Sequence, residues 1–210
     1  MKPPRLLARA LASLAAVIAV ATTAIAARAA EPVGPKERTA AIYTEVQRVA
    51  LETADRATLV AKVLAALDTF IDYDAFAERT LKTTWPKLTG PQRDLFKASF
   101  RKLVIRTYAK KFTPGARFEV AYRGDAVIPD ATRPEAKVKT TLRHGKVAAD
   151  VDYLLVRKAI GGVDAWRAAD IVIDDVSMAL NWRNSFEKIV TKDGFDGLIR
   201  KIEEKTAKEQ

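Results

Sequence analysis

Hydrophobic residues recur every three or four positions along the first part of the chain, which is the spacing of amphipathic α-helices. The pattern predicts a helix over residues 36–52 and a second helix that starts after an N-cap at Asp55. A third, shorter helix is predicted to begin at Asp72 or Asp74 and to run through Leu81. Three helices are therefore expected before residue 85.

The strongest amphipathic pattern lies between two breaks that contain proline. Trp85-Pro86 ends the helical spacing on one side, because proline disfavours helix at the preceding residue, and Thr113-Pro114-Gly115 ends it on the other. Thr89 followed by Gln92 fits a capping box. The apolar face then comprises Leu95, Phe96, Phe100, Leu103, Val104, Thr107, Tyr108 and Phe112. Periodicity alone leaves open whether this face seals a core or covers a cavity for an apolar ligand.

From residue 117 the period of the pattern changes to two, as in β-strands. Strands are predicted over residues 117–124, 137–143, 147–157 and 165–173, and the turns between them are short, so the sheet should be an antiparallel meander. Helical spacing returns from Met178 to about Val190, before a break at Gly194.

One face of a curved sheet needs cover, and the helices must supply it. The sequence therefore predicts an α+β fold, in which a four-stranded antiparallel curved sheet is covered by the N-terminal helices and a C-terminal helix around an apolar pocket.

The N-terminus has the features of an export signal. Basic residues precede an uncharged run, Ala10–Ala27, and A-x-A patterns allow cleavage after Ala26 or Ala29. A membrane anchor is the alternative interpretation of this run. We expect a cleaved signal peptide over residues 1–29, a linker over 30–36, a single domain over 37–207, and localisation in the periplasm. The chain has no cysteine, so disulfides and a lipid-anchored cysteine are excluded.

Charge narrows the range of partners. The formal net charge of +10 falls to +6 when the four basic residues of the signal are removed. A surplus of this size suits anionic lipid headgroups or acidic protein patches. The chain has no concentrated run of lysine and arginine, so nucleic acid is not expected as a partner.

Candidate catalytic groups are few. His144 is the sole histidine and lies in a predicted hairpin turn, so the usual ligands of a transition metal are missing, and no metal is expected. Asp74 and Glu78 could form an acid–base pair on one helix face, but acids that cap a helix start explain them equally well. Alternation places Asp150 and Asp152 on the solvent side of the sheet.

Two blocks of residues resemble the MlaC family, also called toluene-tolerance auxiliary proteins. The first block, Asp72–Phe112, contains Asp-x-Asp, Trp85, Gln92-x-x-x-Phe96-x-x-x-Phe100 and Leu103-x-x-x-Thr107-Tyr108-Ala109. The second contains Trp166, Asp170–Ser177, Asn181-Trp182-Arg183, Ser185-Phe186 and Gly194–Ile199. The chain departs from the family pattern at three positions: Asp175 replaces the usual glycine, Ala169 an aromatic residue and Trp182 a tyrosine.

The resemblance implies a nuclear-transport-factor-like fold with a deep apolar pocket, and no catalysis. It implies binding of glycerophospholipid tails, with the headgroup near solvent and no cofactor besides this cargo. It also implies shuttling between an inner-membrane ABC transporter complex with an MCE-domain protein and an outer-membrane lipoprotein complex. We expect a monomer, and a pocket near or above the top of the usual range of ~300–1,000 Å³.

Helix faces and strand alternation select nine candidates for the pocket wall: Phe100, Val104, Tyr108, Val138, Leu142, Val151, Tyr153, Trp166 and Val176. One alternative is a small α+β enzyme that uses Asp carboxylates for proton transfer on an apolar substrate. Another is a tethering module with a filled core. Carboxylates inside the cavity would favour the enzyme, and an apolar cavity would favour the carrier.

Overall fold

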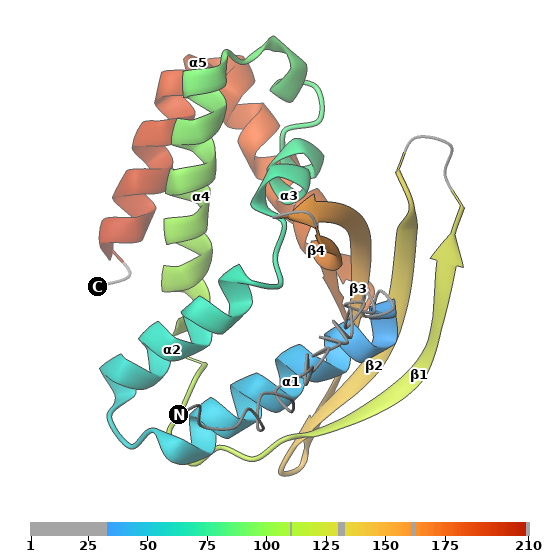
Figure 1. The fold of residues 1–210 in the computed structure, drawn as a ribbon. Coiled ribbons are helices and arrows are strands. Elements are labelled where there is room, and N and C mark those ends of the chain that lie inside the picture. The colour runs from blue at the N-terminus through green and yellow to red at the C-terminus, as the bar shows by residue number, and fades with distance from the viewer. Residues whose placement is uncertain (1–32, 110, 130–132, 161–162, 209–210) are drawn as a thin grey trace, which may run out of the picture. The chain divides into compact units, whose positions relative to one another are not determined.

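The chain runs through helices, then a sheet, then one long helix (Figure 1). This computed structural model describes residues 33–109, 111–129, 133–160 and 163–208. The helices before the sheet are α1 (Pro35–Glu52), α2 (Arg56–Asp68), α3 (Tyr73–Thr80), the short 3₁₀ helix η1 (Trp85–Lys87) and α4 (Gly90–Ala109). The strands are β1 (Glu119–Ile128), β2 (Glu135–His144), β3 (Val147–Ile160), β4 (Val163–Ile173) and β5 (Val176–Ser177), and α5 (Met178–Lys208) follows.

The predicted helix starts are confirmed by side-chain caps. The carboxylate of Asp55 accepts a 2.7 Å hydrogen bond from the backbone N–H of Thr58. Asp72, rather than Asp74, caps α3 and accepts from the backbone N–H groups of residues 74 and 75. Thr89 and Gln92 form the reciprocal capping box, since each side chain accepts from the backbone N–H of the other. Local sequence therefore determines where these helices begin.

The strands form an antiparallel sheet in the order β1-β2-β3-β4-β5. The sequence predicted four strands, and the structure adds β5, whose two residues pair with the end of β4. Register shifts occur between Tyr122 and Gly124 in β1 and opposite Leu154 and Leu155 in β3. Such irregularities increase the local twist and bending of a sheet.

The hydrophobic interior comprises two main clusters, which lie in different layers. One lies between α1, the α2–α3 connection and the inner face of the sheet, and includes Ile42, Phe70, Val138, Tyr153 and Trp166. The other lies among α3, α4 and α5, and includes Phe76, Phe96, Phe100, Trp182, Phe186 and Leu198. Figure 1 shows α1 along the inner face of the sheet and α4 beside α5. The space between these two layers is where a ligand site could form.

Helix α5 changes direction at Gly194, where the sequence predicted a break. Its backbone has φ 71° and ψ −179°, a combination that is essentially restricted to glycine. Residues before the kink, such as Phe186, and after it, such as Leu198, are both buried in the cluster with α3 and α4. The kink therefore lets the two halves of α5 both pack against this cluster.

Three further predictions concern the N-terminal segment, membrane-spanning helices and the exposure of Asp152. The predicted signal peptide lies outside the described residues, and α1 begins at Pro35, inside the predicted linker. None of the helices in the described part of the chain is long and apolar enough to cross a membrane. The prediction that Asp152 faces solvent was wrong, because Arg123 and Lys137 form ion pairs over its carboxylate and leave it 7% exposed.

Candidate ligand-binding site

A cavity of about 380 Å³ lies between α1, α2 and the inner face of the sheet. Helix α1 supplies Ile42, Tyr43 and Val46, because hydrophobic residues at this spacing share the helix face that contacts the sheet. The sheet supplies Leu142, Val151, Tyr153 and Ile171, and the segment after α4 supplies Lys111, Phe112, Thr113, Ala116 and Phe118. We call this space cavity A.

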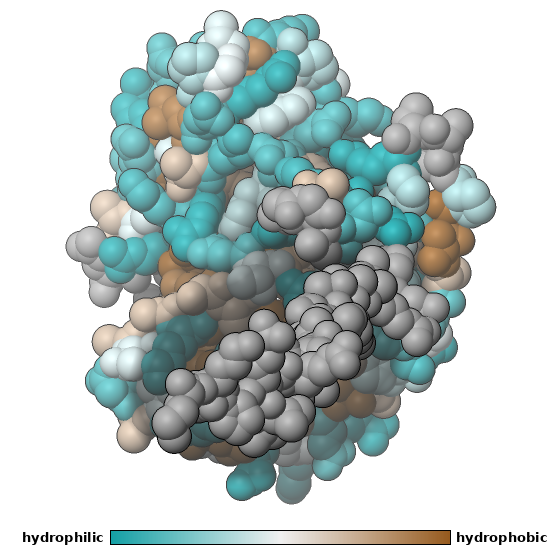
Figure 2. Space-filling model, in the orientation of Figure 1, coloured by the Kyte–Doolittle hydropathy of each residue, from teal (hydrophilic) through white to brown (hydrophobic). Residues whose placement is uncertain are grey.

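A second cavity, of about 270 Å³, lies between α2, the C-terminal end of α4 and the start of α5, and we call it cavity B. Its lining includes Leu64, Val104, Ile105, Tyr108, Ile173, Met178 and Trp182. On the face drawn in Figure 2, hydrophobic residues gather where the C-terminal end of α4 approaches α2. The lining of cavity B is mainly apolar.

The two cavities share part of their lining. Leu67, Ile71, Lys111, Phe112 and Ile171 contribute to both. The expected single pocket near or above ~1,000 Å³ is thus replaced by two smaller neighbouring cavities, because these side chains occupy the space between them. Together the two volumes fall within the usual range for small-molecule sites.

Three hydroxyl groups beside cavity A form a series of hydrogen bonds that ends at a backbone carbonyl. Tyr153 donates a 2.8 Å hydrogen bond to the hydroxyl of Tyr43, which lies 3.2 Å from the hydroxyl of Thr140. Thr140 in turn donates to the carbonyl of Val151, so Tyr43 must donate to Thr140. Burial raises the pKa of the Tyr153 phenol well above its usual value and also raises the pKa of Tyr43. With every donor in use, the wall of cavity A offers no free O–H group from these residues.

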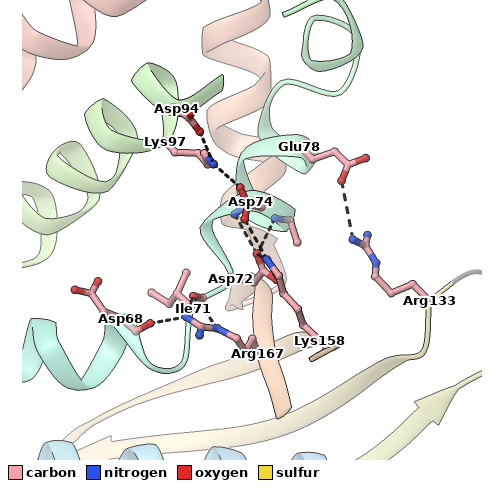
Figure 3. Close-up of polar contacts among 11 residues, drawn as sticks. Asp68, Ile71, Asp72, Asp74, Glu78, Asp94, Lys97, Arg133, Lys158 and Arg167 are labelled. Atoms are coloured by element: carbon pink, nitrogen blue, oxygen red, sulfur yellow. Dashed lines mark hydrogen bonds and ion pairs between the residues drawn. The ribbon is translucent and has the colours of Figure 1, made fainter. Parts of the chain in front are cut away.

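The carboxylates that could have formed an acid–base pair lie elsewhere. Asp74 pairs with Lys97 and Lys158, whereas Glu78 points toward Arg133, as Figure 3 shows. The 2.7 Å hydrogen bond from Lys97 is the main cause that lowers the pKa of Asp74. Among the described residues that line cavities A and B, none is Asp or Glu. The arrangement that would have favoured the enzyme is therefore not found in these two cavities.

Two basic side chains of β3 and β4 hold the segment between α2 and α3 in place. Arg167 donates to the backbone carbonyls of Asp68 and Ile71, and Lys158 contacts the buried carboxylate of Asp72 (Figure 3). His144, the other candidate for chemistry, lines cavity A, and its Nδ1 lies 2.7 Å from the carbonyl oxygen of Arg117. Within the described ranges no group of acidic, histidine or cysteine residues is arranged to hold a metal ion. These polar groups therefore have structural partners.

The structure distributes the nine predicted wall residues over five environments. Leu142, Val151 and Tyr153 line cavity A, and Val104 and Tyr108 line cavity B. Val138 and Trp166 are buried in the cluster behind cavity A but do not line it. Phe100 is buried among helices, stacked on Phe96 with ring centroids 5.5 Å apart. Val176 lines neither cavity and is 54% exposed, because the turn after β4 directs the two-residue β5 away from them.

The prediction missed residues at the α1 face and at the junction of α2 and α3. Ile42 and Val46 were visible as a helical stripe in the sequence, and Leu67 recurred at helical spacing in α2. Phe70 and Ile71 lie in a non-helical connection, where periodicity carries no information. One departure from the family pattern also proves remote from the cavities, since Ala169 is buried against Ala75 and Val156.

Comparisons with known proteins agree with this geometry. The family model described as MlaC protein matches residues 36–204, which is most of the chain. Among solved structures, a phospholipid-binding protein from Ralstonia solanacearum in complex with a phospholipid matches with a TM-score of 0.69. That match has 18% sequence identity and covers 82% of this chain and 96% of the other. No curated protein matches the chain. The resemblance seen in the sequence is thus confirmed, and the chain belongs to the MlaC family.

Proposed function

We propose that the protein carries glycerophospholipid through the periplasm, with the acyl tails in cavities A and B. MlaC proteins are non-enzymatic phospholipid-binding carriers, and the family is periplasmic. The observation that supports the proposal most directly is the lining of the two neighbouring cavities, which is mainly apolar and contains no carboxylate among the described residues. Hydrocarbon tails fit such a lining, whereas the alternative enzyme would need Asp carboxylates beside its substrate.

The energetics explain why lipid needs a carrier. Two sixteen-carbon tails contain about 30 methylenes, each worth about 0.8 kcal/mol on burial, so moving them into water costs on the order of 25 kcal/mol. A dry cavity in which the tails have nearly the same free energy as in the membrane lowers this cost and still allows the lipid to be released. We assign one tail to each cavity, with Leu142, Val151 and Tyr153 against one and Val104 and Tyr108 against the other.

Native mass spectrometry of the exported, gently purified protein tests the proposal. We expect the protein to carry phospholipid, and Leu142→Arg to reduce the bound fraction, because an uncompensated charge would enter cavity A. Thr141→Arg is the matched control, since this neighbour faces the other side of the sheet and donates to Asp150. Lipid-free wild-type protein, or equal loss of lipid in both variants, would contradict the proposal.

The wider route is part of the same proposal. The N-terminal signal directs export and is cleaved after Ala26 or Ala29, so the periplasmic protein should begin at residue 27 or 30, as N-terminal sequencing would show. The folded monomer then exchanges lipid with an inner-membrane ABC transporter complex bearing an MCE-domain protein and with an outer-membrane lipoprotein complex. Labelled phospholipid should move between the carrier and each purified complex, and no transfer to or from either would contradict this route.

A further inference from the structure

Among the described residues, the lining shared by the two cavities contains one charged side chain. Of the five described residues common to both, four are hydrophobic and the fifth is Lys111. It lies two residues after the last residue of α4, and its backbone N–H donates a 2.9 Å hydrogen bond to the carbonyl of Tyr108. The side chain is exposed to solvent. A cation is thus present where the two apolar spaces adjoin.

The described residues place no carboxylate in an ion pair with Lys111, in contrast to Lys97 and Lys158 of the polar cluster in Figure 3. An ammonium group on a flexible stem binds phosphate as a point charge. Lys111 is therefore available to an external anion.

A lipid with two tails has its phosphate attached to the glycerol from which both tails diverge. When one tail occupies cavity A and the other cavity B, the glycerol must lie near the lining that the cavities share. We propose that Lys111 contacts the phosphate of the cargo and makes the protein prefer diacyl lipids with an anionic phosphate over diacylglycerol. This inference rests on the proposed function, because it places the tails in cavities A and B.

A competition experiment between two lipids with identical tails tests the role of Lys111. Delipidated full-length mature protein is incubated with vesicles that contain equal amounts of phosphatidylglycerol and diacylglycerol, and bound lipids are quantified by mass spectrometry. We expect wild type to enrich phosphatidylglycerol, and Lys111→Met to lower the enrichment about two- to fivefold, the effect of one exposed charge pair. Lys111→Arg should retain the enrichment and Lys111→Glu should lower it further. Raised salt should reduce the enrichment in wild type.

Lys102→Met is the control, since Lys102 is exposed on α4 and lines neither cavity. A separate arm adds inorganic phosphate, which should not displace bound phosphatidylglycerol, because the tails hold the lipid. Displacement would instead identify a site for free phosphate and overturn the assignment. Equal enrichment in wild type and all Lys111 variants would overturn the inference while leaving the carrier function intact. Absence of both lipids from wild type would overturn the carrier function itself.

Discussion

The hydroxyl of Tyr153 on β3 donates a 2.8 Å hydrogen bond to the hydroxyl of Tyr43 on α1, across the wall of cavity A. The two rings meet edge to face, with centroids 6.0 Å apart. Because the bond joins the covering helix to the sheet, it fixes the width of the cavity on that side. The two tyrosines have different roles in this series of hydrogen bonds. Tyr153 only donates, whereas Tyr43 accepts from Tyr153 and donates to Thr140, which in turn donates to the carbonyl of Val151.

This difference in roles predicts unequal costs for two similar substitutions. Tyr153→Phe removes the first donor and leaves Tyr43 bonded to Thr140, so we expect a loss of about 0.5–1.5 kcal/mol in the free energy of unfolding. Tyr43→Phe leaves the buried hydroxyl of Tyr153 without its acceptor, and the loss should reach about 1–3 kcal/mol. Denaturant unfolding of delipidated protein measures both, because bound lipid would raise the apparent stability. Equal losses, or the reverse order, would refute the assigned direction.

The same pair predicts a fall in stability at alkaline pH. An unfolded tyrosine ionises near pH 10, whereas burial raises the pKa of Tyr153 in the folded state. The folded state keeps its proton while the unfolded state loses it, so the free energy of unfolding decreases above pH 10, by up to about 1.4 kcal/mol per pH unit for this group. Tyr153→Phe should reduce this slope. An unchanged slope in pH-dependent unfolding would show that the phenol ionises freely in the fold.

A third prediction separates the two aspartates at the start of α3. Asp72 is 4% exposed and accepts two 3.0 Å hydrogen bonds from backbone N–H groups, so Asp72→Ala should cost about 1–2 kcal/mol of stability. Asp74 has a side chain that is 54% exposed, and its ion pairs with Lys97 and Lys158 are solvated. Asp74→Ala should therefore cost less than about 1 kcal/mol.

Chemical denaturation of both variants at neutral pH gives the comparison. Lipid binding should persist in Asp74→Ala, since this side chain lines neither cavity. An Asp74 variant that loses more stability than the Asp72 variant would contradict the capping role of Asp72.

Periodicity predicted the elements well, because each helix and strand carries its own spacing and its own caps. It could not predict the partner of each face. Phe100 on the aromatic stripe of α4 was predicted to line the pocket, yet Phe96 and Phe100 contact Phe186 of α5, and the helix end with Val104 and Tyr108 is the part that lines cavity B. The kink at Gly194 brings α5 back over α4, and this contact between distant segments is absent from any local pattern.

The burial of Asp152 and the path of the α2–α3 connection could not be predicted for a similar reason. Strand alternation placed Asp152 correctly on the outer face, but the long side chains of Arg123 and Lys137 cover it there. Phe70 and Ile71 line cavity A from a segment with no repeating pattern. Their positions follow from Arg167 holding the backbone of this connection, which is a contact between residues almost a hundred positions apart.

The turn between β4 and β5 gives the last prediction. Ile173 pairs with Val176, so the loop has two residues, Asp174 and Asp175, and both have positive φ, 46° and 64°. Two-residue hairpins favour this conformation, and glycine adopts it without steric strain. The family pattern has glycine at the position of Asp175. Asp175→Gly should therefore stabilise the protein by about 0.5 kcal/mol, since steric relief exceeds the added freedom of the unfolded chain.

Asp174→Gly is the matched control at the neighbouring position. The carboxylate of Asp174 accepts a 2.9 Å hydrogen bond from the backbone N–H of Asp150, which ties the turn to β3. Its removal costs about 0.5–1.5 kcal/mol and offsets any steric relief, so this variant should gain no stability. Denaturation midpoints of the two delipidated variants decide the matter. A higher midpoint for Asp174→Gly than for Asp175→Gly would show that backbone strain at 175 is not what limits this turn.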